Sequence, residues 1–248
     1  MEYTPIKRTL ELNSVYQMNC LEGMKLIPDG SIDMILTDLP YGTTQNKWDV
    51  IIPFDQLWKE YIRIIKENGA IVLTASQPFT SALIMSNTKL FRYEWIWKKN
   101  NATGHLNAKR MPMKEHESVV VFYKKQPTYN PQGIIPYNKI TRRGGNGKNY
   151  NNSNTMNYQE YTNYPRTIQQ FSYDKEKYHP TQKPVALFEY LIKTYTNEGD
   201  LVLDNCIGSG TTAVACENLK RNWIGFETEK EYIDIVNKRL QKLYHSLG

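Results

Sequence analysis

Short apolar runs alternate along this chain with segments in which apolar residues recur at helical spacing. The clearest runs, residues 32–37, 70–75 and 201–203, have the length and composition of buried strands. The 54–65 segment instead repeats apolar side chains every three or four positions. Strands that alternate with helices predict an α/β fold with a mostly parallel sheet and helices on both faces.

This pattern predicts a seven-stranded sheet in a Rossmann-like arrangement. The strands are expected at residues 15–18, 32–37, 70–75, 91–97, 118–123, 201–203 and 222–226. Helices are expected at 21–26, from Pro53 to a C-cap at Asn68-Gly69, at 78–86, 184–196 and 211–219, and over the last residues. The strands at 91–97 and 118–123 are expected to pair as a hairpin at a sheet edge.

Periodicity disappears between residues 126 and 178, where Tyr, Asn, Gly, Pro and basic residues dominate. This composition predicts a loop-rich insertion in a single domain, the natural organisation for a chain of 248 residues. The expected parts are residues 1–123, the insertion at 124–178, and residues 179–248.

Charge and cysteine content limit the partners and the location. The formal net charge is +6 and the pI is about 9.0, which favours a polyanion such as nucleic acid. Cys20, Cys206 and Cys216 are far apart and fit neither a disulfide framework nor a metal site. The N-terminus does not have the pattern of a signal peptide, and no apolar run approaches the about 20 residues that cross a bilayer. We expect a cytoplasmic protein without a bound metal.

A glycine-rich turn, Gly208-Ser209-Gly210, separates the 201–203 strand from the next helix. Glycines let the backbone approach a ligand, and Glu227 is placed to accept hydrogen bonds from ribose hydroxyls. Asp204 puts a negative charge ahead of the glycines, which favours the cationic S-adenosylmethionine over a nicotinamide dinucleotide. The alternative is a tight turn in which the glycines only allow the backbone conformation, with Glu227 as a solvated charge.

The 179–184 segment, HPTQKP, stands before the helix that leads into this strand. Its two prolines stiffen it, so Thr181, Gln182 and Lys183 can present donors at low entropic cost, and a carboxylate is a plausible target. The alternative is a rigid helix entry with Pro184 at the first helical position.

An earlier turn, Asp38-Leu39-Pro40-Tyr41, follows the 32–37 strand. Tyr41 can stack on a planar base, which stabilises binding by about 1–3 kcal/mol. Asp38 and the main-chain carbonyl of Leu39 can both accept hydrogen bonds from one exocyclic amino group, which favours the tetrahedral nitrogen of a transition state. An ordinary turn with Tyr41 packed as a lid is the alternative. Ligands of open α/β sheets bind where strand order reverses, so the strands before the two turns are expected to be neighbours.

These residues resemble the amino-methylating DNA methyltransferases of the β class. The resemblance rests on Asp38 to Tyr41, the HPTQKP segment and residues 204–211, in this order, and on residues 109–122 with His116-Glu117. In this circularly permuted class the catalytic motif precedes the cofactor motif. The resemblance implies the methyltransferase fold, S-adenosylmethionine as methyl donor, double-stranded DNA as partner, and methylation of an exocyclic nitrogen on a flipped base. A homodimer is expected because the class often forms one.

The resemblance also implies roles for individual residues. In the catalytic motif, which includes Pro40, Asp38 and Leu39 would hold the target amino group and Tyr41 would stack on the base. Glu227 would take the ribose hydroxyls of the cofactor. Other cofactor contacts are implied for Asp204, Cys206, Gly208, Ser209, Gly210, Thr211, Thr181, Gln182, Lys183, Asn19 and Cys20.

Three positions depart from the family pattern. Leu39 replaces the first of two usual prolines, Cys206 replaces a usual Phe and is interpreted as a packing residue, and the acid often found near Asn19 and Cys20 is absent. An initial Asp in the catalytic motif is usual for adenine N6 methylation, whereas Ser is more frequent in cytosine N4 enzymes. Adenine is therefore favoured, with cytosine as the alternative.

Basic residues indicate two DNA contacts. A loop between the hairpin strands is expected to hold phosphates around the flipped nucleotide, through Lys98, Lys99, Asn100, His105, Lys109 and Arg110. The insertion is expected to recognise the target sequence, with Arg142, Arg143 and Lys148 as candidates. Charged solvated loops are the alternative. A nicotinamide-dependent oxidoreductase and an inert DNA-binding module are the alternatives of another class.

Overall fold

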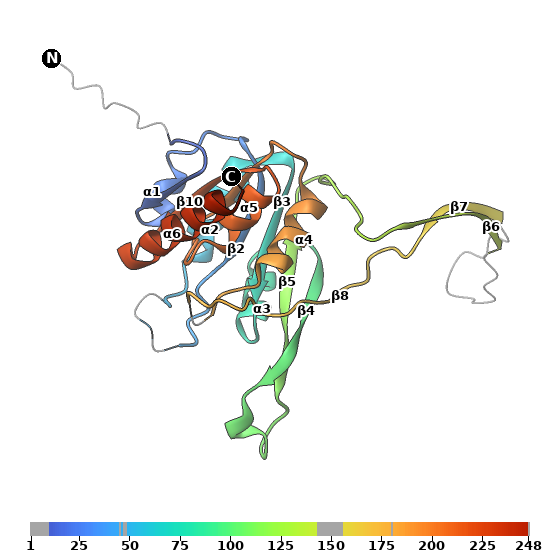
Figure 1. The fold of residues 1–248 in the computed structure, drawn as a ribbon, viewed down its shortest axis with the longest axis horizontal. Coiled ribbons are helices and arrows are strands. Elements are labelled where there is room, and N and C mark those ends of the chain that lie inside the picture. The colour runs from blue at the N-terminus through green and yellow to red at the C-terminus, as the bar shows by residue number, and fades with distance from the viewer. Residues whose placement is uncertain (1–9, 45, 47–48, 143–155, 180, 248) are drawn as a thin grey trace. The chain divides into compact units, whose positions relative to one another are not determined.

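The computed structural model describes residues 10–44, 46, 49–142, 156–179 and 181–247. The chain divides into two compact units, one of Met1–Asn130 with Thr167–Gly248 and the other of Pro131–Arg166. The first unit contains an eight-stranded sheet with helices, and the second contains a two-stranded sheet (Figure 1). Among the described residues, no helix has the length and apolar character needed to cross a membrane.

The large sheet has the strand order β1-β10-β9-β2-β3-β5-β4-β8. Neighbouring strands from β1 to β3 are parallel, β5 is antiparallel to both β3 and β4, and β8 is parallel to β4. The strands are β1 (Ser14–Gln17), β2 (Ile32–Asp38), β3 (Ile65–Ala75), β4 (Phe91–Thr103), β5 (Lys114–Phe122), β8 (Ile168–Gln170), β9 (Leu201–Asp204) and β10 (Asn222–Glu227).

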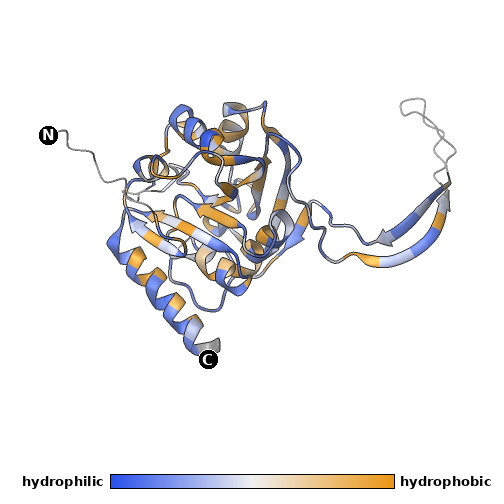
Figure 2. Cartoon of the chain, turned by 90° about the horizontal axis from the view of Figure 1, so that it is seen from above, coloured by the Kyte–Doolittle hydropathy of each residue, from blue (hydrophilic) through white to orange (hydrophobic). Residues whose placement is uncertain are grey.

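Helices cover both faces of this sheet, as predicted. They are α1 (Cys20–Met24), α2 (Phe54–Ile64), α3 (Phe79–Ser86), α4 (Val185–Tyr195), α5 (Thr211–Asn218) and α6 (Lys230–Leu247), with a short 3-10 helix η1 (His105–Asn107). Hydrophobic residues concentrate on the central strands, whereas hydrophilic positions dominate α6 (Figure 2).

The core consists of two hydrophobic clusters, one on each face of the sheet. Ile35 and Leu36 are neighbours in β2 and fully buried, yet they belong to different clusters. Ile35 shares its cluster with Leu57 of α2, and Leu36 shares the other with Leu191 of α4. A strand buried on both sides needs an unbroken apolar run, which explains why the 32–37 segment does not alternate.

The predicted C-cap at Asn68-Gly69 was wrong. Helix α2 ends at Ile64, and Ile65 is already extended, with ψ 136°. Gly69 lies inside β3, where a Cβ atom would approach the carbonyl oxygen of Asp33 to 2.9 Å. The glycine therefore permits close approach of two strands and does not end a helix.

The hairpin prediction was confirmed, but its place in the sheet was wrong. Strands β4 and β5 pair as an antiparallel hairpin. Strand β8 pairs with the outer edge of β4, so the hairpin does not form the edge of the sheet. The described sheet has eight strands where seven were predicted. The predicted loop-rich insertion contains β8 and the strands β6 (Ile135–Arg142) and β7 (Met156–Thr162), which pair with each other. Polar and aromatic residues build these strands, so no apolar run indicated them.

Candidate functional site

The turns that follow β2 and β9 share one cavity. These two strands pair in parallel, which confirms that they are neighbours. A cavity of about 560 Å³ opens at their carboxyl ends, and its lining includes Asp38 and Tyr41 from one turn and Asp204 and Gly208 from the other. Strand order reverses between β9 and β2, which is where open α/β sheets bind ligands.

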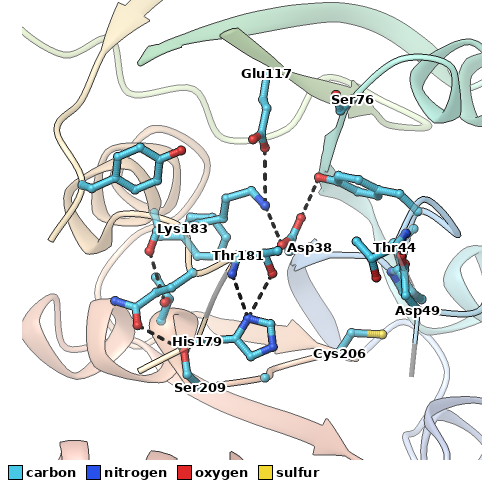
Figure 3. Close-up of a pocket in the computed structure, with 18 of the residues that line it drawn as sticks. Asp38, Thr44, Asp49, Ser76, Glu117, His179, Thr181, Lys183, Cys206 and Ser209 are labelled. Carbon is cyan, nitrogen blue, oxygen red and sulfur yellow. Dashed lines mark hydrogen bonds and ion pairs between the residues drawn. The ribbon is translucent and has the colours of Figure 1, made fainter. Parts of the chain in front are cut away.

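Asp38 ends β2 and is hydrogen-bonded through both carboxylate oxygens. Its Oδ1 accepts hydrogen bonds from the hydroxyls of Tyr41, at 2.7 Å, and Thr74. Its Oδ2 lies 2.6 Å from the Nζ of Lys183. Figure 3 shows Lys183 between Asp38 and Glu117, whose Oε2 is 3.4 Å from the same Nζ. One cation therefore joins a carboxylate of β2 to a carboxylate of β5.

Lys183 is a buried cation, with only 5% of its surface exposed. Burial by itself would lower the pKa of its ammonium group, but the charges of Asp38 and Glu117 outweigh burial and raise that pKa. Glu117 also pairs with Lys99, at 2.5 Å. The members of this chain of charges lie far apart in the sequence, so no local pattern predicts it, and only the His116-Glu117 pair points to Glu117.

Tyr41 is held as a neutral donor beside Asp38. Burial first, and then the negative charge of Asp38, raise the pKa of the Tyr41 phenol well above its usual value. Its ring stacks on Phe79, with centroids 5.1 Å apart and an interplanar angle of 27°. Leu39 packs into the core and, like Pro40, lines the cavity.

Asp49 fixes the loop that follows Tyr41. Its carboxylate accepts hydrogen bonds from the backbone amides of Gly42, Thr43 and Thr44 at 2.7–2.9 Å. Burial acts to raise the pKa of Asp49, but the hydrogen bonds from these three residues outweigh it and lower the pKa. A lone Asp in a polar loop carries no distinctive pattern, so the sequence does not predict this role of Asp49.

Asp204 is a buried carboxyl group at the end of β9. It accepts hydrogen bonds from the hydroxyls of Thr37, at 2.7 Å, and Thr212, and from the backbone amide of Cys206, at 3.1 Å. Burial nevertheless raises the pKa of Asp204 to about 6, because these hydrogen bonds only partly offset the loss of water. An approaching cation would stabilise its charged form.

Glu227 supports the glycine turn. Its Oε2 accepts a hydrogen bond from the amide of Gly208 at 2.9 Å, and its Oε1 accepts from the amides of Thr228 and Glu229. Gly208 has φ +49°, a conformation that most side chains disfavour. Glu227, Gly208, Ser209, Thr211 and Cys206 all line the cavity.

Side chains of the HPTQKP segment hold the preceding loop in place and also line the cavity. Gln182 is buried, donates to Asp174 at 2.8 Å and accepts from the amide of Tyr178 at 2.9 Å, so it holds the preceding loop. Thr181 is exposed, and its hydroxyl lies 3.0 Å from the His179 ring. Thr181, Gln182 and Lys183 all line the cavity.

Three predicted cofactor residues lie outside the cavity lining. Asn19 caps α1 by accepting a hydrogen bond from the Leu21 amide at 2.9 Å, and Cys20 is buried in the core. Gly210 leads into α5 with φ +82°, and a Cβ atom there would meet Val236 at 2.9 Å. These positions shape the ends of helices, and their cofactor contacts stay predictions.

The basic residues of the β4–β5 hairpin differ in exposure. Lys98, Asn100, His105, Lys109 and Arg110 are exposed. Lys99 differs from these exposed side chains, and its predicted contact with DNA stays a prediction. Lys99 is 7% exposed and pairs with Glu117, because alternate residues of β4 point to the opposite side.

Only one of the three predicted recognition residues belongs to the described part of the chain. Arg142 is the last residue of β6, whereas Arg143 and Lys148 lie outside the described residues.

Within the described part of the chain, no group of three or more His, Cys, Asp or Glu side chains is arranged to hold a metal ion.

Known proteins resemble this chain over most of its length. The Type II methyltransferase M.HpaI of Haemophilus parainfluenzae is 31% identical over 92% of this chain and 74% of its own. The DNA adenine methyltransferase YhdJ of Escherichia coli (strain K12) is 27% identical over 95% and 85% of the two chains.

Solved structures share the fold. The M1.HpyAVI–SAM complex matches with a TM-score of 0.64 and 26% identity over 91% of this chain and 98% of its own. The cytosine-N4-specific PvuII DNA methyltransferase matches with a TM-score of 0.70 and 19% identity over 93% and 87%, a likeness of fold alone.

The strongest assignment comes from a family model. The model described as DNA methylase matches residues 32–238, a span that contains both turns, the β4–β5 hairpin and the HPTQKP segment. The shared cavity and the order of its motifs agree with this match. The chain therefore belongs to the DNA methylase family.

Proposed function

We propose that this chain transfers a methyl group from S-adenosylmethionine to the exocyclic N6 of adenine in double-stranded DNA. The observation that carries the proposal is the single cavity in which the Asp38 turn and the glycine turn meet. A methyl donor on one turn and a flipped base on the other would lie against each other there.

The residues of the second turn suit a cationic, nucleoside-containing cofactor. Asp204 is a buried carboxyl group in the cavity lining, and a cationic group would compensate its burial. Gly208 brings the backbone close to the cavity, and Glu227 has lone pairs left for ribose hydroxyls. S-adenosylmethionine supplies an activated methyl group on its sulfonium, so direct displacement needs no metal or covalent intermediate.

Asp38 is proposed to position the target amino group. Together with the Leu39 carbonyl it accepts the amino hydrogens, which favours the localised lone pair that attacks the methyl carbon. Asp38 then takes up the proton that the nitrogen loses. Its Oδ2 now holds Lys183, which must move to admit the base. Glu117 offers Lys183 a second anionic partner as it moves.

Adenine is favoured over cytosine by the initial Asp of the catalytic turn and by the relative named a DNA adenine methyltransferase. Cytosine N4 methylation is the alternative, since the cytosine-specific PvuII enzyme has the same fold. Membership in the methylase family excludes the alternative of a nicotinamide-dependent oxidoreductase.

The exposed basic residues of the β4–β5 hairpin are proposed to contact DNA phosphates. The Pro131–Arg166 unit is proposed to recognise the DNA sequence. A homodimer and a cytoplasmic location stay predictions.

The test is to incubate the purified chain with plasmid DNA and methyl-labelled cofactor, and to digest the product to nucleosides. We expect label on N6-methyladenosine. Label on cytosine would contradict the choice of base. Sequencing the methylated plasmid gives the recognition sequence in the same experiment.

Asp38→Ala tests the assigned role of the catalytic turn. We expect methylation to fall by at least about 100-fold, because the amino group loses its carboxylate acceptor. Cofactor binding, measured by calorimetry, should persist. Asp55→Ala, an exposed carboxylate on α2, is the control and should leave turnover unchanged. Unchanged turnover in Asp38→Ala would refute the assignment, and an inactive wild-type chain that binds DNA would support the inert module.

A further inference from the structure

The β4–β5 hairpin ends in a tip that lies beyond the last residue pair between its two strands. The ladder is regular as far as Lys98 and His116, and the final pair joins Thr103 to Lys114. Residues 104–113, including η1, form the tip, which projects away from the large sheet (Figure 1). Gly104, with φ +92°, makes the turn into η1.

The base of this tip forms part of the cavity that holds Asp38. Asn101, Thr103 and Lys114 all line that cavity. The tip therefore begins at the rim of the proposed base pocket. A duplex that delivers a base into the pocket must pass beside it.

The tip exposes apolar side chains in a basic setting. Leu106 is 99% exposed, and Met111 and Met113 are 57% and 37% exposed. The exposed cations Lys109 and Arg110 lie in the same loop. An exposed apolar side chain flanked by cations complements DNA, in which phosphates surround a stack of apolar base faces.

The acidic residues near the tip do not cancel this charge. Glu115 lies 3.7 Å from Lys98, and Glu117 is held by Lys99 and Lys183. Lys114, next to the tip, is exposed as well. The charge of the tip and its position at the pocket favour DNA over a second copy of the chain.

We infer that the tip inserts Leu106 into the duplex beside the target nucleotide and supports the stack that the flipped base leaves. Removal of a base from a duplex breaks stacking contacts, at a cost of a few kcal/mol. Apolar side chains that enter between bases are a known way to hold DNA in such a distorted form. This inference rests on the proposed function.

The test compares two duplexes that contain the recognition sequence found on the plasmid. In one the target adenine faces thymine, and in the other it faces an abasic site, so that less pairing must be broken. For Leu106→Ala we expect methylation of the matched duplex to fall at least about tenfold, equivalent to ~1.4 kcal/mol. Methylation of the abasic duplex should change little, and Leu106→Met should retain activity on both.

The controls separate a wedge from a structural role. Ile62→Ala removes an exposed apolar side chain from α2, near the amino ends of β2 and β3, and should leave both activities unchanged. Fluorescence of 2-aminopurine at the target position should rise on binding of the wild type and rise less with Leu106→Ala. Thermal unfolding should be unchanged, because Leu106 is almost fully exposed.

Three results would overturn the inference. They are full activity of Leu106→Ala on the matched duplex, an equal loss on both duplexes, and a loss that follows a change of oligomeric state in sedimentation. If the wild type methylates neither duplex, the proposed function fails and the wedge is refuted with it. A wild type that methylates both while Leu106→Ala matches it refutes the wedge alone.

Discussion

Asp204 combines deep burial with a position in the proposed cofactor site. Its pKa is raised to about 6, whereas an aspartate in water titrates near 3.8. The protonated form is therefore the more stable one below about pH 6. A cationic cofactor prefers the ionised form, so binding must compete with the proton in this range.

We predict that affinity for S-adenosylmethionine increases from pH 5 to pH 7. At pH 5 a group with a pKa of about 6 is about 90% protonated, so affinity should be about tenfold below its plateau. Calorimetric titration at several pH values measures this dependence. Asp204→Asn should bind more weakly and lose the dependence, whereas Asp234→Asn, an exposed position on α6, should retain it. A flat pH profile in the wild type would contradict the prediction.

Lys183 shows what the sequence does not reveal at the residue scale. Its motif predicts a contact with a carboxylate, and the resemblance implies the cofactor as its partner. In the structure its Nζ pairs with Asp38, 145 positions away, and with Glu117. Such partners follow from the packing of β2 against its neighbours, and no local pattern encodes them. The proposed contact with the cofactor stays a prediction.

At the scale of elements, the β4–β5 hairpin carries the DNA-binding prediction. Its pairing followed from two apolar runs, but β4 extends to Thr103, beyond the predicted end at Trp97. The added residues, Lys98 and Lys99 followed by NNAT, contain no apolar run, and this composition predicts a loop. Backbone pairing with β5 continues the strand where side-chain periodicity gives no signal.

Lys109→Ala should weaken DNA binding in a salt-dependent way. If Lys109 contacts one phosphate, the slope of log affinity against log salt should become shallower by about 0.9, and the loss should be similar for specific and unrelated DNA. Fluorescence anisotropy over a salt series measures the slope. Lys59→Ala, an exposed lysine on α2, provides the matched control. Equal slopes for both variants would remove Lys109 from the interface.

At the scale of the whole molecule, the two compact units have separate roles in the proposal. Both hydrophobic clusters are built from residues outside Pro131–Arg166. The smaller unit is a two-stranded hairpin with exposed Ile140, Met156 and Tyr158. A two-stranded hairpin is marginally stable by itself in water, and the smaller unit supplies no residue to either cluster.

Replacing Pro131–Arg166 by a flexible glycine-serine linker should leave the larger unit folded. No core residue is removed, so cooperative thermal unfolding and cofactor binding should persist. Methylation at the wild-type recognition sequence should be lost, because the proposed sequence-reading unit is absent. Calorimetry and sequencing of methylated plasmid test the two halves of the prediction. A shortened chain that modifies the same sites would show that recognition lies elsewhere.

The sequence by itself determined the alternation of strands and helices, the two turns and their order, and the resemblance that led to the methylase family. These features are local, since buried runs, helical spacing and turn residues are encoded within a few neighbouring positions. Only the tertiary structure decided that β8 pairs with β4 as the outer strand of the sheet, that Lys183 joins Asp38 to Glu117, and that Leu106 stands exposed in a hairpin tip whose base lines the cavity. The strand pairing and the ion pairs depend on contacts between segments far apart in the chain, and the exposure of a side chain depends on which segments do not pack against it. They are set when the elements pack together.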